Sequence, residues 1–309
     1  MVTRLVYLTK NYHVNPLLQR LLKPAVSVLL LAWVFNKIPL PSIKDIIAQC
    51  HWPELLAAFA LINACMLVSA VKWRMLLTAL HIEVSLARLV SFYYAGLFAN
   101  NFLPSSIGGD ALRIYDTARL SGQAGDAAAS VVMERLLASL ALGLTAAAAL
   151  VLVSGPGGQT LMAWCVGGLV AVCLAALLFL FWYPFNRDGR IGRWLCRLKK
   201  YREHAGALVM VMILSFLFQG TMVLANVFIF RAIGVDIPLI QHFLYIPVIM
   251  AVSMVPLSIN GLGVREGMYV LLYGWSGLDA AAALAGAMVF FVQVGLTSLA
   301  GGIIIALRK

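Results

Sequence analysis

The chain has 309 residues, of which 62% are hydrophobic and only 11% are charged, and its mean hydropathy is +0.94. A soluble domain of this length could not bury so much apolar surface, so the composition excludes a water-soluble globular protein and indicates a polytopic membrane protein. The formal net charge is +11, but the basic residues occupy short loops and tails, as is typical of membrane proteins, and we expect no nucleic-acid binding.

Six apolar segments are predicted to span the bilayer, which requires about 20 residues each. In chain order they are 22–38, 54–80, 127–153, 159–184, 205–231 and 279–307. The first follows a basic N-terminus without a small-residue cleavage site, so we expect a retained span and not a removed signal peptide. Two shorter apolar segments, 85–103 and 239–257, each run into a motif rich in Pro and Gly.

Lys and Arg in the short loops predict the orientation of the spans. Basic residues precede the first span, fill the 185–204 loop and end the chain. Both termini and this loop are therefore expected on the cytoplasmic side of a bacterial cytoplasmic (inner) membrane. Lys72, Arg74 and Arg88, around the end of the second span, are expected on the same side.

The two Pro/Gly motifs are copies of each other. The first contains Pro104, Ser106, Ile107, Gly109 and Arg113, and the second contains Pro256, Ser258, Ile259, Gly261 and Arg265, each 152 residues further on. Tyr93 and Tyr245 share this offset, and it also places spans 54–80 and 127–153 on spans 205–231 and 279–307. Such an internal repeat predicts a duplicated architecture.

The orientation requires an even number of crossings between residues 85 and 122, yet the limb after the first motif is only about ten residues long and, at ~1.5 Å per residue, cannot cross. We therefore predict re-entrant hairpins at 85–122 and 239–276, with tips at 104–109 and 256–263. Each half then has three full crossings, so residues 1–153 and 154–309 would form an inverted-topology repeat within one all-α membrane domain, with the tips meeting near the bilayer midplane.

The tips supply candidate substrate-binding residues. Gly109 and Gly261 permit positive φ or close approach. Ser106 and Ser258 are suited to capping the outgoing half-helix, whose N-terminus attracts anions. Asn260 flanks the second tip and is predicted to line a cavity.

Arg113 and Arg265 follow the tips by about one helical turn. An arginine inside a bilayer needs a partner or water, and two arginines from opposed hairpins could hold a phosphate group between them. The alternative is that each pairs with an acid, which would be Asp110 or Asp116 for Arg113 and Glu266 or Glu134 for Arg265.

Four charged residues near the tips have uncharged residues at the corresponding positions of the other half, namely Asp110, Glu134, Arg135 and Glu266. The acids among them are candidates for proton coupling, because clamping a substrate would not require them. Neutralisation of the arginines is the alternative role.

Motifs of soluble enzymes are missing from the sequence, which has no Walker A loop, no HExxH and no GxSxG. The five cysteines form no CxxC or Cys/His cluster. We expect no cofactor, no metal site and no enzyme activity. Two other functions stay open, an intramembrane lipid-modifying enzyme (or a subunit of one) and a transporter of a small soluble anion, and the oligomeric state is not predicted.

Three elements carry a family resemblance: Pro-Ser-Ser-Ile-Gly-Gly-Asp-Ala-Leu-Arg at 104–113, Glu134-Arg135, and Gly-Leu-Gly-Val-Arg-Glu-Gly at 261–267. Over nearly its whole length the chain resembles the flippase-like integral membrane family of the lysylphosphatidylglycerol synthase transmembrane region. In bifunctional relatives a cytosolic transferase makes an aminoacylated phospholipid and the membrane part moves it across the bilayer.

The resemblance implies the translocating part alone, with a membrane lipid as substrate. The lipid would be anionic or contain phosphate, either a phospholipid or a polyprenyl-phosphate-linked lipid. By motif, the resemblance implies a lipid path lined by Arg113, Glu134, Arg135, Arg265 and Glu266.

Overall fold

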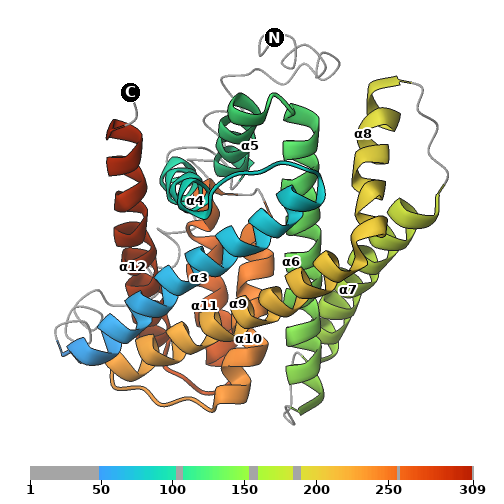
Figure 1. Cartoon of the computed structure of the whole chain (residues 1–309). Coiled ribbons are helices and arrows are strands. Elements are labelled where there is room, and N and C mark those ends of the chain that lie inside the picture. Colours follow the sequence, from blue (N-terminus) through green and yellow to red (C-terminus); the bar gives the residue numbers. More distant parts are fainter. Residues whose placement is uncertain (1–48, 102–106, 153–158, 184–188, 256–257, 308–309) are drawn as a thin grey trace, which may run out of the picture.

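The computed structural model describes residues 49–101, 107–152, 159–183, 189–255 and 258–307, and every regular element in these ranges is helical (Figure 1). The longer helices are α3 (Trp52–Ala79), α6 (Ala124–Leu152), α7 (Gln159–Trp182), α9 (Ala205–Ala232) and α12 (Ala280–Leu307). The shorter ones are α4 (Leu86–Asn100), α5 (Ile107–Ser121), α8 (Gly189–Lys199), α10 (Leu239–Met254) and α11 (Val264–Gly274). The predicted span 22–38 lies outside the described residues, as do Pro104, Ser106 and Pro256.

Five of the described helices are long and apolar enough to cross a membrane. They lie within three residues of the five predicted spans that follow the first one. Large apolar side chains are exposed on their outward faces, among them Leu67, Leu178, Ile213 and Leu299. Such a surface requires lipid around it, so the chain is a multi-pass integral membrane protein.

Two long helices from different halves of the chain, α3 and α9, form the most extensive helix pair and run across the centre of the molecule (Figure 1). The short helix α4 packs on α12, and the short helix α10 packs on α6. In the same way α5 contacts α4 and α6, whereas α11 contacts α10 and α12. Each of these contacts in one half of the chain therefore has a counterpart in the other half.

Glycine allows two of these helix contacts to be made by backbone. A Cβ atom added at Gly301 in α12 would overlap the carbonyl oxygen of Tyr94 in α4, and one added at Gly109 in α5 would overlap the carbonyl oxygen of Gly96 in α4. Small residues permit such close approach between helices in membranes. Gly109 thus allows the backbones of α4 and α5 to approach closely, as expected for a tip residue, and it lies within a helix.

The segment 185–204 was expected to be a basic loop, but much of it is helical. Helix α8 continues through a 3₁₀ turn, Lys200–His204, into α9. Its apolar residues Trp194, Leu195 and Leu198 pack against a buried cluster, while Arg193 is exposed. The spacing of apolar residues along one face of a helix explains this arrangement.

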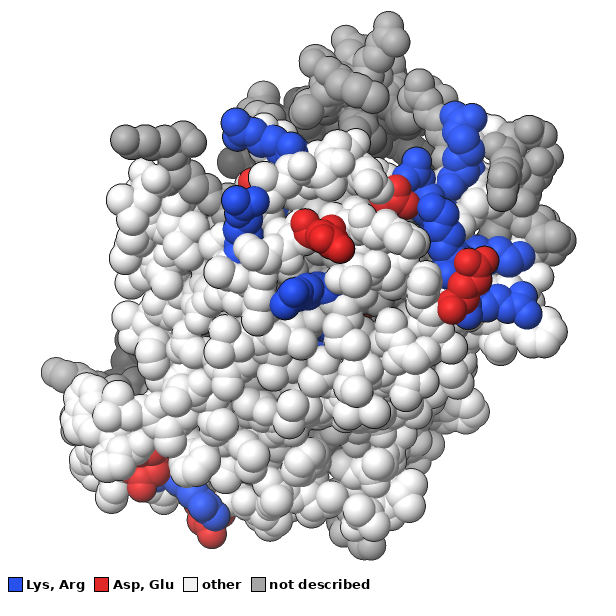
Figure 2. All heavy atoms as spheres, viewed as in Figure 1, with Lys and Arg blue, Asp and Glu red and all other residues white. Residues whose placement is uncertain are grey.

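Figure 2 shows where the charges lie on one face of the molecule. Most of the visible Lys and Arg side chains gather toward the end where α5 and α8 lie, the broad band below carries few charges, and a small group of both signs lies at the opposite end. Within the charged end, Arg197 of α8 forms an ion pair with the buried Asp126 of α6. A charge-poor band next to a basic end is the pattern that a bilayer and its headgroups require.

Candidate functional site

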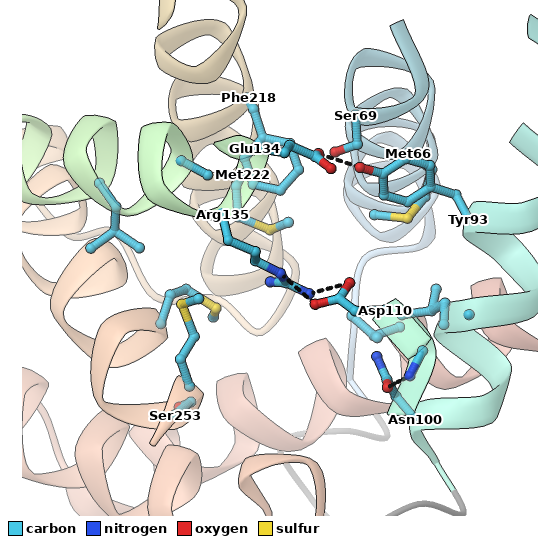
Figure 3. A pocket seen from close by; sticks show the side chains of 18 of the residues that line it. Met66, Ser69, Tyr93, Asn100, Asp110, Glu134, Arg135, Phe218, Met222 and Ser253 are labelled. Atoms are coloured by element: carbon cyan, nitrogen blue, oxygen red, sulfur yellow. Dashed lines mark hydrogen bonds and ion pairs between the residues drawn. The ribbon is translucent and has the colours of Figure 1, made fainter. Parts of the chain in front are cut away.

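A cavity of ≈ 320 Å³ lies among residues of α3, α4, α5, α6, α9, α10, α11 and α12 (Figure 3). Much of its lining is apolar, with Ile62, Met66, Leu142, Met222 and Phe290 as examples. Six charged side chains line it as well: Lys72, Asp110, Arg113, Glu134, Arg135 and Arg265. The cavity therefore combines surroundings suited to hydrocarbon with a concentrated set of charges.

Arg113 contacts two carboxylates and two aromatic rings. Its Nη2 donates to Glu134 Oε2 at 2.6 Å and its Nη1 donates to Asp110 Oδ1 at 3.2 Å. The guanidinium also lies over the rings of Trp73 and Tyr93, at 4.1 Å and 3.7 Å from the ring centroids. Because this residue is only 4% exposed, the carboxylates and rings replace the water that a buried cation loses.

The contacts of Arg113 extend into a chain of bonds across three helices. Tyr93 Oη of α4 donates to Glu134 Oε1 of α6. At the other end, Arg135 donates to Asp110 of α5 through Nε at 2.8 Å and Nη2 at 3.0 Å. Figure 3 shows both ends of this chain facing the cavity.

The second motif makes a smaller cluster. Arg265 donates to Glu266 Oε1 through Nη2 at 2.7 Å and Nε at 3.1 Å. Its guanidinium also lies 5.5 Å from the ring centroid of Phe290 and 5.3 Å from that of Phe291. The other oxygen of Glu266, Oε2, accepts the backbone N–H of Gly263 at 2.6 Å. Both partners of this ion pair are buried.

The N-termini of the two half-helices are already occupied by side chains of the protein. At α11 the occupant is the Glu266 carboxylate, and Ser258 does not cap the helix, because its buried Oγ has no partner among the described atoms. At α5 the backbone N–H of Gly109 donates to Asn100 Oδ1 at 2.7 Å. At the start of each of these helices, one backbone N–H is thus bonded to a side chain of the protein.

The arginines contact acids, as the structural alternative predicted. Arg113 contacts Asp110 and Arg265 contacts Glu266. Glu134, which was considered as a partner of Arg265, instead binds Arg113. The reason is that α5 packs against α6 on the face that carries Glu134.

The second tip has the special backbone that its sequence indicated. Asn260 and Gly261 both have positive φ values, 49° and 75°, in the left-handed region that favours Gly and Asn. The side chain of Asn260 donates to Asn101 Oδ1 at 3.3 Å, and Asn101 in turn donates to Ser298 Oγ at 2.7 Å. The tip is thereby connected to the end of α4 and to α12.

Most of the sequence-derived candidates come together in this cavity. Its lining includes Gly109, Asp110, Arg113, Glu134, Arg135, Asn260 and Arg265. Glu266 reaches it through Arg265, whereas Ser258 and Gly261 belong to the second tip but not to the lining. Ser106 is outside the described residues.

Lys72 was missed as a cavity residue. It was assigned to the cytoplasmic side of the second span, but it is 2% exposed and lines the cavity from α3. Its spacing from other buried residues of α3, Cys65, Ser69 and Leu76, is the helical signal that could have found it. The described residues contain no group of three or more His, Cys, Asp or Glu side chains placed to hold a metal ion.

Two archaeal proteins are similar to this chain along most of its length. A UPF0104 membrane protein of Archaeoglobus fulgidus is 21% identical over 280 residues, covering 80% of this chain and 84% of the relative. A second UPF0104 membrane protein, from Pyrococcus horikoshii, is 22% identical over 287 residues, covering 81% of this chain and 86% of the relative.

A known protein family matches most of the chain. Residues 20–301 match the family described as the lysylphosphatidylglycerol synthase TM region. This range includes every residue that lines the cavity and both tip motifs. The chain therefore belongs to the lysylphosphatidylglycerol synthase transmembrane-region family.

Proposed function

We propose that the protein is a lipid flippase or transporter that moves an anionic or phosphate-containing lipid across the cytoplasmic membrane. The observation that carries this proposal is the cavity among the helices, in which cationic side chains outnumber carboxylates and much of the remaining lining is apolar. A lipid with a phosphate headgroup matches both features, because its headgroup needs cations and its tail needs hydrocarbon.

The ion pairs of the cavity support such a role. Arginines that already touch carboxylates keep their positions without a ligand, so a binding surface built around them is preorganised. Arg135 keeps 41% of its side-chain surface exposed while bonded to Asp110. It can therefore contact a headgroup without leaving its partner.

We also propose that the two halves of the chain, residues 1–153 and 154–309, form an inverted repeat whose short helices are re-entrant hairpins. The repeated motifs and the reciprocal contacts of α4 with α12 and of α10 with α6 support this. Such repeats place a binding site near the bilayer midplane and allow it to open alternately to each side. In this arrangement both termini lie in the cytoplasm.

Moving a lipid requires binding and release but no covalent step, so the proposed role is not an enzymatic one. The family to which the chain belongs is named for the membrane region of a lipid-modifying synthase, which supports a lipid substrate. Neither a cofactor nor a nucleic-acid partner is part of this proposal.

Reconstitution into liposomes tests the proposal. Fluorescent phosphatidylglycerol in the outer leaflet is bleached with dithionite, and the protected fraction reports movement between leaflets. Wild-type protein should lower the protected fraction, and Ala138→Trp, which fills the cavity from α6, should slow the movement at least ~10-fold.

The matched control is Ala148→Trp, which adds the same bulk to an exposed position of the same helix and should transport normally. Wild-type liposomes with the same bleaching curve as protein-free liposomes would refute the flippase assignment for this lipid. Equal rates in both tryptophan variants would show that the cavity is not the path.

A further inference from the structure

Lys72 is a buried cation between α3 and α9, which pack antiparallel along much of their length. Its Nζ donates to Ser215 Oγ at 3.4 Å and lies 4.9 Å from the ring centroid of Phe218, and both of these residues belong to α9. The side chain lines the cavity beside Ser69 and Gln219. Among the described residues it has no ion-pair partner within 4.0 Å.

The carboxylates of the cavity are bonded to other groups, and none of them has an oxygen within 4.0 Å of Lys72 Nζ. Glu134 accepts from Arg113 and Tyr93. Asp110 accepts from Arg113 and Arg135, which together use both of its oxygens.

Glu266 is occupied in the same way. One of its oxygens accepts from Arg265 and the other from the backbone of Gly263. The three arginines and three carboxylates are therefore paired with one another, and the fourth cation, Lys72, has no ion-pair partner among the described residues.

We propose that Lys72 is the residue that binds the phosphate of the transported lipid, and that this phosphate is a singly charged phosphodiester. The inference rests on the proposed transport function. It adds which residue contacts the phosphate and which charge the phosphate carries. Four cations against three carboxylates leave one positive charge in the cluster, and a single negative charge neutralises it. An ion kept from water is costly unless it is paired, so the cavity favours a ligand that completes the balance.

A phosphomonoester fits this balance less well. At neutral pH it approaches two negative charges, so it would leave an excess anion among Met66, Met222 and Phe290, which give the cavity an apolar wall. An ammonium group is also suited to this role, since it is a compact donor that needs no fixed planar geometry. The bonded guanidinium groups then serve to shape the cavity around the ligand.

Binding to purified full-length protein in neutral detergent tests the inference, with short-chain phosphatidylglycerol as the probe. Lys72→Gln should weaken binding at least about tenfold, which corresponds to the loss of one charge-assisted hydrogen bond, and Lys72→Arg should retain most of it. The matched control is Arg74→Gln, which removes a positive charge from an exposed position on the same helix and should leave binding unchanged. Unchanged binding in Lys72→Gln, or an equal loss in Arg74→Gln, would overturn the assignment.

Two further ligands test the charge of the bound phosphate and the need for acyl chains. Phosphatidic acid with the same acyl chains should bind more weakly than phosphatidylglycerol, and tighter binding would overturn the single-charge assignment. Glycerophosphoglycerol, the water-soluble headgroup without tails, should bind much more weakly than the lipid. Equal binding would mean that the site takes a free phosphodiester, which contradicts the flippase proposal but keeps the role of Lys72.

Thermal unfolding without ligand separates binding from a structural role. If Lys72 stabilised the fold through its contacts, Lys72→Gln would melt at a lower temperature. Because it is an unpaired buried cation, we expect the variant to melt at the same or a higher temperature. A marked drop in melting temperature together with normal lipid affinity would overturn the inference.

Discussion

Glu134 is bonded to two side chains that come from two other helices. It accepts from Arg113 of α5 and from Tyr93 of α4, and the whole group is buried against Trp73 of α3. A charge in such a position is stabilised only while its partner is present. Substitutions at this carboxylate therefore measure how much the ion pair and hydrogen bond among α4, α5 and α6 contribute to the stability of the protein.

Glu134→Gln should destabilise the protein strongly, since it leaves Arg113 buried with a neutral partner on that side. Breaking a buried ion pair costs about 3–5 kcal/mol, so the melting temperature in detergent, followed by tryptophan fluorescence, should fall clearly. The control is Glu83→Gln, the same change at an exposed position, which should have little effect. Adding Arg113→Met to Glu134→Gln should recover part of the loss, and a further loss would contradict this account.

The chemistry of these residues could be predicted from the sequence, but their partners could not. Arg113, Asp110 and Glu134 were identifiable because charges in apolar segments are costly and therefore informative. Which acid meets which arginine depends on the rotation of α5 against α6, and hydropathy does not encode it. Lys72 was missed for a different reason. A lysine near the end of a span is also the usual marker of the cytoplasmic side, so its sequence position did not indicate a buried cavity residue.

At the scale of elements, α4 and α12 meet through a contact that only glycine permits. Gly301→Ala would push a methyl group into the Tyr94 carbonyl, so the two helices must separate. Overpacking of this kind costs about 1–3 kcal/mol, and the melting temperature should drop by several degrees. Gly295→Ala, on the same helix with no neighbour within 4 Å of the new methyl group, should melt like the wild type or slightly higher.

Helix lengths were predictable because hydrophobic length is a direct signal of a membrane span. The described spans accordingly begin and end close to the predicted positions. Helix α8 was not predicted, since four of its eleven residues are charged and it resembles a loop by composition. Only the pairing of Trp194 and Leu198 with the buried cluster shows why it folds.

At the scale of the whole molecule, the inverted repeat that we propose predicts the side on which each loop lies. With all native cysteines replaced, Asp236→Cys between α9 and α10 should react with a membrane-impermeant maleimide in intact cells. Arg193→Cys in α8 should react only after the cells are permeabilised. Both positions are exposed, so a difference in labelling reports the side of the membrane, and labelling of both from the same side would contradict the repeat.

The backbone contact between Gly301 and Tyr94 limits how this protein can move. Helices in such close contact slide or rotate against each other only if the contact is broken, so α4 and α12 belong to one rigid body although they come from different halves of the sequence. The reciprocal pair, α10 with α6, also joins the two halves of the chain. Any movement in a transport cycle would therefore have to carry α4 and α12 together, so the moving parts would not coincide with the two halves of the sequence.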